Sequence, residues 1–403
     1  MKILMLTQWF DPEPTFKGLA FAHELQQQGH EVQVITGFPN YPGGKLYAGY
    51  KVRCLQKEEI DGVFVTRVPL YPSHDKSGFK RALNYISFAA SSCIFGVFSA
   101  KRADVIYAYH PPLTVGMAAI VIGFFRRTPV VYDIQDMWPD TLQATGMLNN
   151  PRILSFIGKV CQWVYRRAAA LVVLSPGFKE LLVRRGVPEE KVSVIYNWCD
   201  AQALSGASAK MPVAMSGYFN IIFAGNMGKA QALYAVLEAS KIVAHQNSLV
   251  QFVFIGGGVE LDSLKKYAVS AGINNVIFLP RLPIQEIGAV LKSADVLLVH
   301  LRDDSLFEIT VPSKTQAYMA VGKPLLMAVR GDAAKLVEDA KCGLLAEPEN
   351  PDSIAKAVLN FAAMQKHELD SMGKRGSEFY QKNLSIKIGA KNFVDIFEKI
   401  REY

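Results

Sequence analysis

The chain has 403 residues, half of them hydrophobic, and a formal net charge of +8. This length exceeds what one hydrophobic core usually organises, so we expect two domains of about 200 residues each. The positive charge favours a negatively charged partner, such as a nucleotide, a nucleic acid or an anionic membrane. The five cysteines are scattered and never in CxxC spacing, which argues against a disulfide scaffold or a zinc site and favours a reducing cytoplasm.

Strand and helix alternate from the amino terminus onward. Lys2–Thr7 predicts a first strand, because its apolar run is too short for the core of a signal peptide. Phe16–Gln28 predicts a helix that stops at Gly29, and Glu31–Thr36 predicts the next strand. Later strands are predicted at Val63–Val68, Asp104–Ala108, Pro129–Asp133, Ala170–Leu174 and Val192–Tyr196. This alternation indicates a mostly parallel sheet covered by helices on both faces.

One segment of this first part, Ala82–Ala100, has no charged residue and is flanked by basic residues at both ends. Its length meets the minimum for a membrane-spanning helix, but Asn84 and four serines dilute its apolar character. We favour a helix packed within the domain over a helix lying against a membrane surface, and both over a transmembrane span. Arg152–Arg167 also mixes aromatic and basic residues, which is consistent with contact between this domain and a membrane surface.

A second series of strands and helices follows a stretch without pattern at 201–217, which we interpret as a linker. Its strands are predicted at Asn220–Ala224, Gln251–Ile255, Val276–Leu279, Asp295–His300 and Pro324–Val329. Leu384–Tyr403 predicts an amphipathic helix that packs on either domain. The predicted organisation is an amino-terminal domain at 1–200, the linker, a carboxyl-terminal domain at 218–383 and the last helix at 384–403.

Two glycine turns end successive strands of the second domain. Gly225 and Gly228 would let the backbone approach a diphosphate, and Lys229 would neutralise its charge. Gly257 would bring backbone N–H groups to the same edge of the sheet. A plain packing turn is the alternative for both motifs, because the G-x-x-G spacing is a weak pattern.

The stretch Glu308–Pro324 is typical of a loop that enters a helix directly after an apolar strand. The start of a helix offers unpaired N–H groups and the positive end of the helix dipole, which suits a phosphate. Ser313 and Lys314 lie at this start, and Lys314 would add a full positive charge. Glu308 only accepts hydrogen bonds when it is ionised, so it is suited to sugar hydroxyls.

The first domain places polar residues after its strands, at the edge where open α/β sheets bind ligands. His110 ends one strand before two prolines, which favours a bond to a sugar hydroxyl or a phosphate over a structural role. Asp136 and Trp138 follow the next strand, and Asp136 could act as a base or simply cap a helix. Lys17 and Gly18 start the first helix at the same edge. The sequence contains no metal-ligand spacing, so no metal site is expected.

Together these motifs resemble the retaining glycosyltransferases of family 4 over nearly the whole chain. The resemblance rests on Gly29–Val32, the hinge Asn197–Asp200, the turn Ala224–Gly228 and the stretch Glu308–Pro324. It implies the GT-B fold, an α/β architecture of two Rossmann-like domains facing across a cleft, with the last helix crossing back to the first domain as one option. Phe38–Gly44 and Pro312–Tyr318 resemble, more narrowly, bacterial N-acetyl-L-fucosamine transferases of O-antigen clusters.

The resemblance implies roles for residues of the second domain. Glu308 would lie near the donor sugar. Gln316 stands where the family has a glutamate that holds the ribose, and it lacks the charge-assisted part of that bond. Asn226 stands where the family commonly has an arginine, which leaves Lys229 and Lys314 as the cations for the diphosphate.

The implied reaction is retaining, metal-independent transfer from a UDP-sugar, with no cofactor, and His110 matches the family's active-site histidine in placement. The implied acceptor is a polyprenyl-diphosphate-linked saccharide of O-antigen or related surface polysaccharide synthesis, and N-acetyl-L-fucosamine is one candidate sugar. Such an enzyme would be cytoplasmic and peripheral on the inner face of the cytoplasmic membrane, with an anionic membrane surface and no nucleic acid as partner. The alternatives are a nucleotide-sugar 2-epimerase of the same fold and a non-catalytic protein that binds a nucleotide or glycan.

Overall fold

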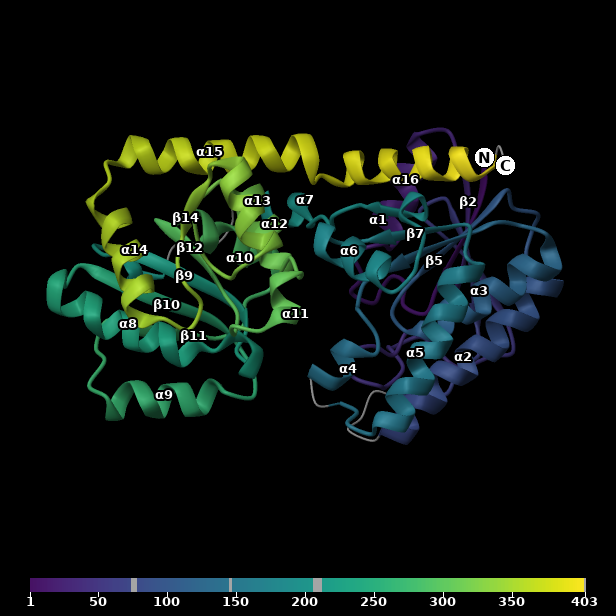
Figure 1. Cartoon of the computed structure of the whole chain (residues 1–403), viewed down its shortest axis with the longest axis horizontal. Helices are drawn as coiled ribbons and strands as arrows, with labels where there is room; N and C mark the ends of the chain where they lie inside the picture. Colours follow the sequence, from purple (N-terminus) through teal and green to yellow (C-terminus); the bar gives the residue numbers. More distant parts are fainter. Residues whose placement is uncertain (74–77, 145–146, 206–211, 402–403) are drawn as a thin grey trace. The chain divides into compact units, whose positions relative to one another are not determined.

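The chain folds into two compact units, each built on one β-sheet with helices on both faces (Figure 1). The computed structural model describes residues 1–73, 78–144, 147–205 and 212–401. The first unit comprises Met1–Tyr196 together with Ile386–Tyr403, and the second comprises Asn197–Ser385. The helix predicted at 384–403 therefore belongs to the first unit. Both sheets are mainly parallel, which confirms the predicted α/β class.

The first sheet has eight strands, and its strand order reverses between β1 and β5. From edge to edge its strands are β3 (Gln56–Ile60), β4 (Val63–Val68), β2 (Glu31–Gly37), β1 (Lys2–Thr7), β5 (Val105–Tyr109), β6 (Val130–Ile134), β7 (Ala170–Val173) and β8 (Val192–Val194). Only β3, of the strands described in this sheet, runs antiparallel to its neighbour. The prediction omitted β3 because its sequence QKEEI is polar, as suits an exposed edge strand.

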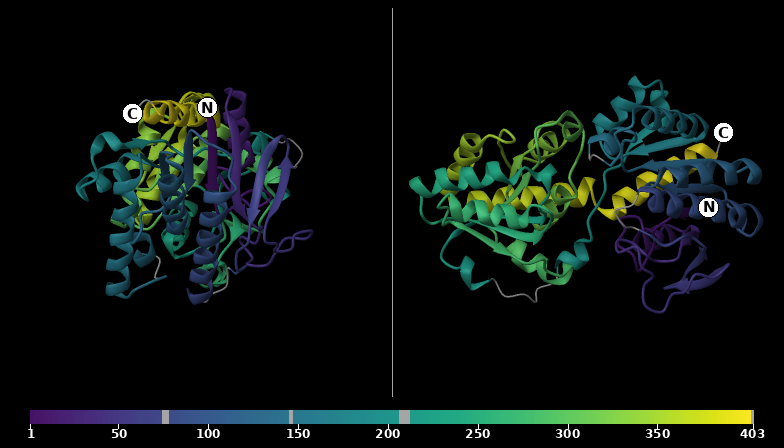
Figure 2. Two further views of the ribbon diagram at one scale, coloured as in Figure 1. Left: turned by 90° about the vertical axis from the view of Figure 1, so that its right-hand side faces the viewer. Right: turned by 90° about the horizontal axis from the view of Figure 1, so that it is seen from below.

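Two layers of helices cover the first sheet. Its helices are α1 (Leu19–Gln27), α2 (Gly78–Phe98), α3 (Leu113–Arg126), α4 (Asp140–Ala144), α5 (Pro151–Arg167), α6 (Pro176–Arg184) and α16 (Ile386–Arg401). α2, α3 and α5 lie side by side on one face, while α16 packs against α1 (Figure 1, Figure 2). Tyr132 of β6 faces α3 and α5, whereas Tyr107 of β5 faces α1 and α16, because side chains alternate between the two faces of a sheet.

A buried ion pair lies beneath α1 and α16. Lys17 Nζ is 3.4 Å from an oxygen of Asp133, and neither side chain has exposed surface. Asp133 also accepts hydrogen bonds from the Tyr107 hydroxyl at 2.6 Å and from the Gln135 amide at 2.7 Å. The ring of Phe393, from α16, lies 5.5 Å from Lys17 Nζ and packs edge to face against Tyr107. The charges are thus paired and hydrogen-bonded, which is the condition for burying them.

The second sheet reverses its strand order between β9 and β12. Its strands, from edge to edge, are β11 (Val276–Leu279), β10 (Val250–Gly257), β9 (Phe219–Asn226), β12 (Val296–His300), β13 (Leu325–Ala328) and β14 (Gly343–Leu345). Its helices are α7 (Ala201–Ser205), α8 (Leu233–Gln246), α9 (Leu261–Ser270), α10 (Ile284–Lys292), α11 (Ser305–Glu308), α12 (Ser313–Val321), α13 (Asp332–Ala340), α14 (Pro351–Ala363) and α15 (Lys366–Asn383). The strands predicted for this unit are all present, and β14 is an additional short strand.

The predicted linker at 201–217 begins with α7, which packs on α10 and α12 of the second unit. Residues 206–211 of this linker lie outside the described part of the chain.

The uncharged segment 82–100 forms most of α2, which packs against α3 and the sheet as favoured from the sequence. Among the described residues, no helix has both the length and the apolar character needed to cross a membrane.

We expect Lys17→Ala to lower the free energy of unfolding by about 3–5 kcal/mol, because it leaves the Asp133 carboxylate buried and unpaired. The measurement is urea unfolding followed by circular dichroism. Lys335→Ala is the control, because its partner Asp339 lies 3.3 Å away on an exposed helix surface where ion pairs contribute little. The double variant Lys17→Met/Asp133→Leu should recover part of the loss, and equal unfolding midpoints for Lys17→Ala and the wild type would contradict the assignment.

Candidate functional site

An opening between β9 and β12 lies at the carboxyl edge of the second sheet. The two strands pair only at Ile221 and Ile222, whereas β9 continues beside β10 as far as Asn226. Beyond the last β12 contact, the Tyr318 hydroxyl of α12 accepts from the Ala224 N–H at 2.9 Å and lies 3.2 Å from the Ala224 carbonyl oxygen. α12 thus completes the bonding of β9 where the strands diverge. A reversal of strand order is the place where open α/β sheets bind ligands.

Lys314, in the first turn of α12, extends to this opening. Its Nζ lies 3.3 Å from the ring centroid of Phe223 and has no hydrogen-bond partner among the described residues. Part of the residue is accessible, but the Nζ atom itself is buried. Burial lowers the pKa of Lys314 to about 7. An ammonium that has lost its hydration and gained only an aromatic face is poised to pair with an anion.

Glycines bring the backbone close to this lysine. A Cβ atom on Gly225 would lie 3.0 Å from Cε and 3.3 Å from Nζ of Lys314, and one on Gly256 would collide with the Gly225 carbonyl. Both glycines have φ of +138°, which side chains rarely adopt. Gly257 differs, because nothing lies within 4 Å of its Cβ position. The edge is therefore narrow beside Gly225 and open at Gly257, as the approach of a ligand to the backbone requires.

The remaining turn residues are already bonded to one another. The Gly228 N–H donates to the side-chain oxygen of Gln231 at 3.0 Å, and the exposed Asn226 amide lies 3.4 Å from the same oxygen. Lys229 is exposed in the short turn that holds Gln231. The N–H of Gly228 is thus occupied, while the Lys229 side chain is accessible.

His300 was not predicted and holds this turn in place. Its Nδ1 lies 2.7 Å from the Gln231 carbonyl, and its Nε2 accepts from the Glu349 N–H at 3.0 Å. Burial lowers the pKa of His300. A neutral imidazole whose two nitrogens both bond to the backbone fixes the position of the turn. The sequence alone could not distinguish this histidine from an ordinary strand residue.

The loop and the helix predicted within Glu308–Pro324 are present, and the helix is α12. Glu308 itself ends α11, a short helix that was not predicted. Glu308 is exposed at the end of α11, and Ser313 is exposed at the start of α12. Gln316 is 2% exposed, and in the amide orientation that suits its neighbours its nitrogen donates to the carbonyls of Pro312 at 2.9 Å and Ser313 at 3.2 Å. Contact between Gln316 and a ribose would require these bonds to be exchanged.

In the first unit, the loops after β5 and β6 bring predicted residues together. His110 is buried, its Nδ1 has no hydrogen-bond partner among the described residues, and burial lowers its pKa to about 3. Its ring packs edge to face against Tyr132 at 5.9 Å and Trp138 at 5.5 Å. Asp136 accepts the Trp138 N–H through its backbone carbonyl at 3.0 Å, and burial raises the pKa of its carboxyl group. His110 is therefore neutral, and its Nδ1 is buried.

Lys17 and Gly18 have structural surroundings instead. The ammonium of Lys17 is the buried partner of Asp133. Gly18 precedes α1, whose Leu19 N–H donates to Asp11 Oδ2 at 2.7 Å, and a Cβ on Gly18 would lie 2.3 Å from that oxygen. The absence of a side chain at Gly18 lets the carboxylate reach the start of the helix.

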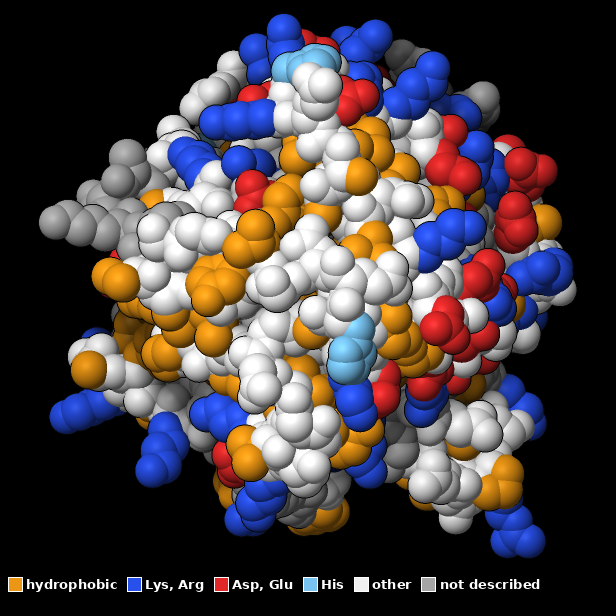
Figure 3. Space-filling view, turned by 90° about the vertical axis from the view of Figure 1, so that its left-hand side faces the viewer, with side chains coloured by type: hydrophobic (Ala, Val, Ile, Leu, Met, Phe, Trp, Pro, Cys, Tyr) orange, Lys and Arg blue, Asp and Glu red, His pale blue; other side chains and the backbone are white. Residues whose placement is uncertain are grey.

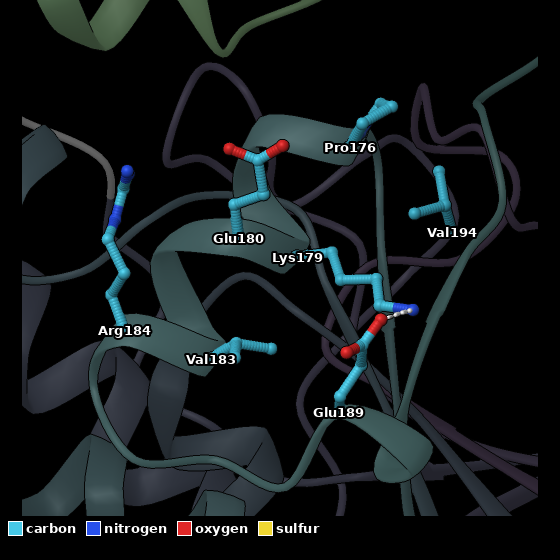
Figure 4. Close-up of a pocket in the computed structure, with 7 residues that line it drawn as sticks. All are labelled: Pro176, Lys179, Glu180, Val183, Arg184, Glu189 and Val194. Atoms are coloured by element: carbon cyan, nitrogen blue, oxygen red, sulfur yellow. Dashed lines mark ion pairs between the residues drawn. The ribbon is translucent and has the colours of Figure 1, made fainter.

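A separate depression of the first unit lies along α6 and β8 (Figure 4). The residues that line it are Pro176, Lys179, Glu180, Val183, Arg184, Glu189 and Val194. Lys179 and Glu189 form an ion pair of 3.1 Å within it. None of the predicted site residues lines this depression. In the part of the chain that the structure describes, no group of three or more His, Cys, Asp or Glu side chains could hold a metal ion.

We expect Lys314→Met to stabilise the ligand-free protein below pH 7, because it removes a buried charge that no described residue pairs by a hydrogen bond. The pKa of this lysine is lower in the folded than in the unfolded chain, so wild-type stability increases as the pH rises from about 7 toward 10.5. The gain of the variant should therefore be constant below pH 7 and shrink above it. The difference in unfolding temperature between variant and wild type, measured at several pH values, tests this. A change of 1 kcal/mol shifts that temperature by about 2–4 °C for a unit of this size. A variant less stable than the wild type at pH 6 would contradict it.

Comparisons with known proteins cover both units. The model of a glycosyl transferase 4-like domain matches residues 19–198, and that of the glycosyl transferases group 1 matches residues 218–363. The probable glycosyltransferase WbjE of Pseudomonas aeruginosa is 26% identical over 73% of this chain and 74% of its own. WcaI of Escherichia coli (strain K12), named as a candidate colanic acid biosynthesis glycosyl transferase, is 26% identical over 91% of this chain and 93% of its own.

Solved structures of similar fold extend the comparison. Anabaena Alr3699/HepE in complex with UDP-glucose has a TM-score of 0.67 at 16% identity and covers 99% of this chain and 100% of its own. The α,α-trehalose 6-phosphate synthase of Burkholderia multivorans has a TM-score of 0.73 at 13% identity, over 99% and 96% of the two chains. With a 4-like domain followed by a group 1 domain, this chain belongs to the glycosyltransferases of the GT-B type.

Proposed function

We propose that this glycosyltransferase moves a sugar from a UDP-sugar to a polyprenyl-diphosphate-linked saccharide, with retention at the anomeric carbon and without a metal ion. The observation that carries the donor proposal is Lys314, whose buried ammonium has no hydrogen-bond partner among the described residues at the opening between β9 and β12. A diphosphate would supply the missing negative charge, and the open backbone at Gly257 leaves room for it. The structural relative HepE was solved with UDP-glucose, which supports a UDP-sugar as donor.

The chemistry we propose depends on positioning and charge. The bond from the sugar to the diphosphate breaks, the acceptor oxygen bonds to the anomeric carbon on the same face, and the leaving diphosphate takes the acceptor's proton. Lys314, with Lys229, would stabilise the charge that develops on the leaving group, and Glu308 would hold sugar hydroxyls. His110, which burial keeps neutral, would exchange a hydrogen bond with a hydroxyl without contributing a charge.

The name of one relative supports the proposed acceptor. WcaI is named for the biosynthesis of colanic acid, which supports a role in surface polysaccharide synthesis. We propose an O-antigen or related polysaccharide, with N-acetyl-L-fucosamine as one candidate sugar, and peripheral attachment to the inner face of the cytoplasmic membrane, where such lipid-linked acceptors are assembled.

We expect the purified protein to extend a polyprenyl-diphosphate-linked saccharide with one sugar and to release UDP. The assay is a panel of UDP-sugars that includes UDP-N-acetyl-L-fucosamine, with product mass and anomeric configuration measured by mass spectrometry and NMR. Conversion of a UDP-sugar into another without acceptor would identify an epimerase, and tight UDP binding with no turnover of any donor would identify a binding protein. Either result would overturn the transferase proposal.

We expect the affinity for UDP to fall by up to about tenfold per pH unit above pH 7, because a neutral Lys314 has to take up a proton when the diphosphate binds. Lys314→Gln should bind UDP about 10–100-fold more weakly at pH 7 and lose this pH dependence. Isothermal titration calorimetry between pH 7 and 9.5 measures both effects. Lys265→Gln, an exposed lysine of α9, is the matched control and should bind like the wild type. Wild-type affinity in Lys314→Gln would refute the assignment.

A further inference from the structure

Helix α2 of the first unit buries several polar residues and exposes a row of apolar ones. Its buried positions are Asn84, Phe88, Ser91, Ser92 and Gly96, so Phe88 is the one large apolar side chain among them. Its exposed face carries large apolar side chains from its first turn to its last, three or four residues apart except for the eight residues between Ile86 and Ile94. Most of them are more than half exposed: Phe79 (79%), Leu83 (39%), Ile86 (58%), Ile94 (56%) and Phe98 (82%). Folding does not account for this apolar row, since a surface helix normally turns such a row toward the core.

The inward-facing polar residues are bonded to the loops at the carboxyl edge of the sheet. Asn84 accepts from the Gln8 amide at 2.5 Å and donates to the Tyr71 carbonyl at 2.7 Å. Ser91 donates to the Pro69 carbonyl at 2.6 Å. Gln8 directly follows β1, and His110 directly follows the neighbouring β5, whose last residue Tyr109 pairs with Thr7. α2 is thus fixed in orientation by its polar side, which holds the apolar row outward.

The charges of this helical layer have a single sign. α2, α3 and α5 contain no Asp or Glu, and together they carry seven Lys and Arg residues. These cations are Lys80, Arg81, Arg126, Arg152, Lys159, Arg166 and Arg167. The neighbouring helices add further exposed apolar side chains, Phe124 and Phe125 at the end of α3 and Ile153 and Phe156 at the start of α5. On the face of the second unit in Figure 3, by contrast, basic and acidic side chains occur together.

The apolar row and the basic charge together indicate what kind of partner binds this face. A second copy of the same face would bring like charges together, which disfavours self-association. A bilayer containing anionic lipids fits both features, because apolar side chains enter the level of the acyl chains while lysine and arginine remain at the phosphates. The row is also exposed along the full length of the helix, so it suits a flat partner.

We propose that the face of α2, α3 and α5 docks on an anionic bilayer, with α2 lying in the membrane interface. The carboxyl edge of the first sheet, where α2 and α5 begin, then lies close to the lipid phosphates. This inference rests on the proposed function only for its purpose, which is to bring His110 within reach of a lipid-linked acceptor. Binding to lipid is a separate property that needs no substrate.

The test is cosedimentation of the full chain with vesicles of phosphatidylcholine alone or mixed in equal parts with phosphatidylglycerol. The wild type should bind the mixed vesicles, and Ile86→Ser/Ile94→Ser/Phe98→Ser should lower the partition coefficient about tenfold or more. The matched control, Leu249→Ser/Val259→Ser/Val269→Ser, replaces equally exposed apolar residues of the second unit and should bind like the wild type. Arg152→Glu/Lys159→Glu should also lose binding, whereas Lys265→Glu/Lys266→Glu on α9 should not.

Circular dichroism and UDP affinity in solution check that each variant is folded. The proposal would be overturned if the wild type failed to bind mixed vesicles or bound neutral vesicles equally well. It would also be overturned if the α2 triple variant bound like the wild type. Equal binding by both triple variants would show that the contact with lipid lies elsewhere. Vesicle binding without any sugar transfer would leave this inference standing and refute the proposed function. Transfer to a soluble short-chain acceptor without vesicle binding would support the proposed function and refute this inference.

Discussion

The separation of β9 and β12 beyond Ile222 determines how the second unit is built at its carboxyl edge. Backbone groups that lose a strand partner need another one, and the Tyr318 hydroxyl supplies it at Ala224. α12 therefore has to lie against the opening, and its first turn brings Lys314 beside Gly225. The position of the helix, the glycine requirement and the isolated charge all follow from one break in the ladder of strand hydrogen bonds.

The two units treat a buried lysine in opposite ways. Lys17 has a carboxylate at 3.4 Å, further hydrogen bonds to that carboxylate and an aromatic cover, so its charge is balanced within the fold. Lys314 has an aromatic ring and no hydrogen-bond partner among the described residues, so the fold leaves its charge unbalanced. A paired buried charge such as Lys17 contributes to the structure. An unpaired one such as Lys314 lowers the stability of the folded protein, and a bound anion would restore that stability.

Much of the fold followed from apolar runs, because strands buried on both faces, such as β12, are continuous in hydrophobicity. The edge strand β3 escaped prediction because its alternation is polar. Position after a strand or at a helix start singled out His110, Lys314 and Lys17 alike. It could not reveal that Lys17 has a buried partner, because Asp133 lies far along the chain. Tyr318 was missed even though its spacing of four residues places it on the same side of α12 as Lys314.

The first unit is discontinuous in sequence, and this affects how the chain reaches its folded state. Phe393 of α16 packs against Phe21 and Tyr107 and lies over Lys17. During synthesis, residues 1–196 leave the ribosome long before α16 is translated. Their aromatic cluster and buried ion pair therefore lack the cover of α16 while the second unit is made. The domain translated first is therefore the last to close its core, and a stop codon before residue 386 would damage the amino-terminal half of the protein.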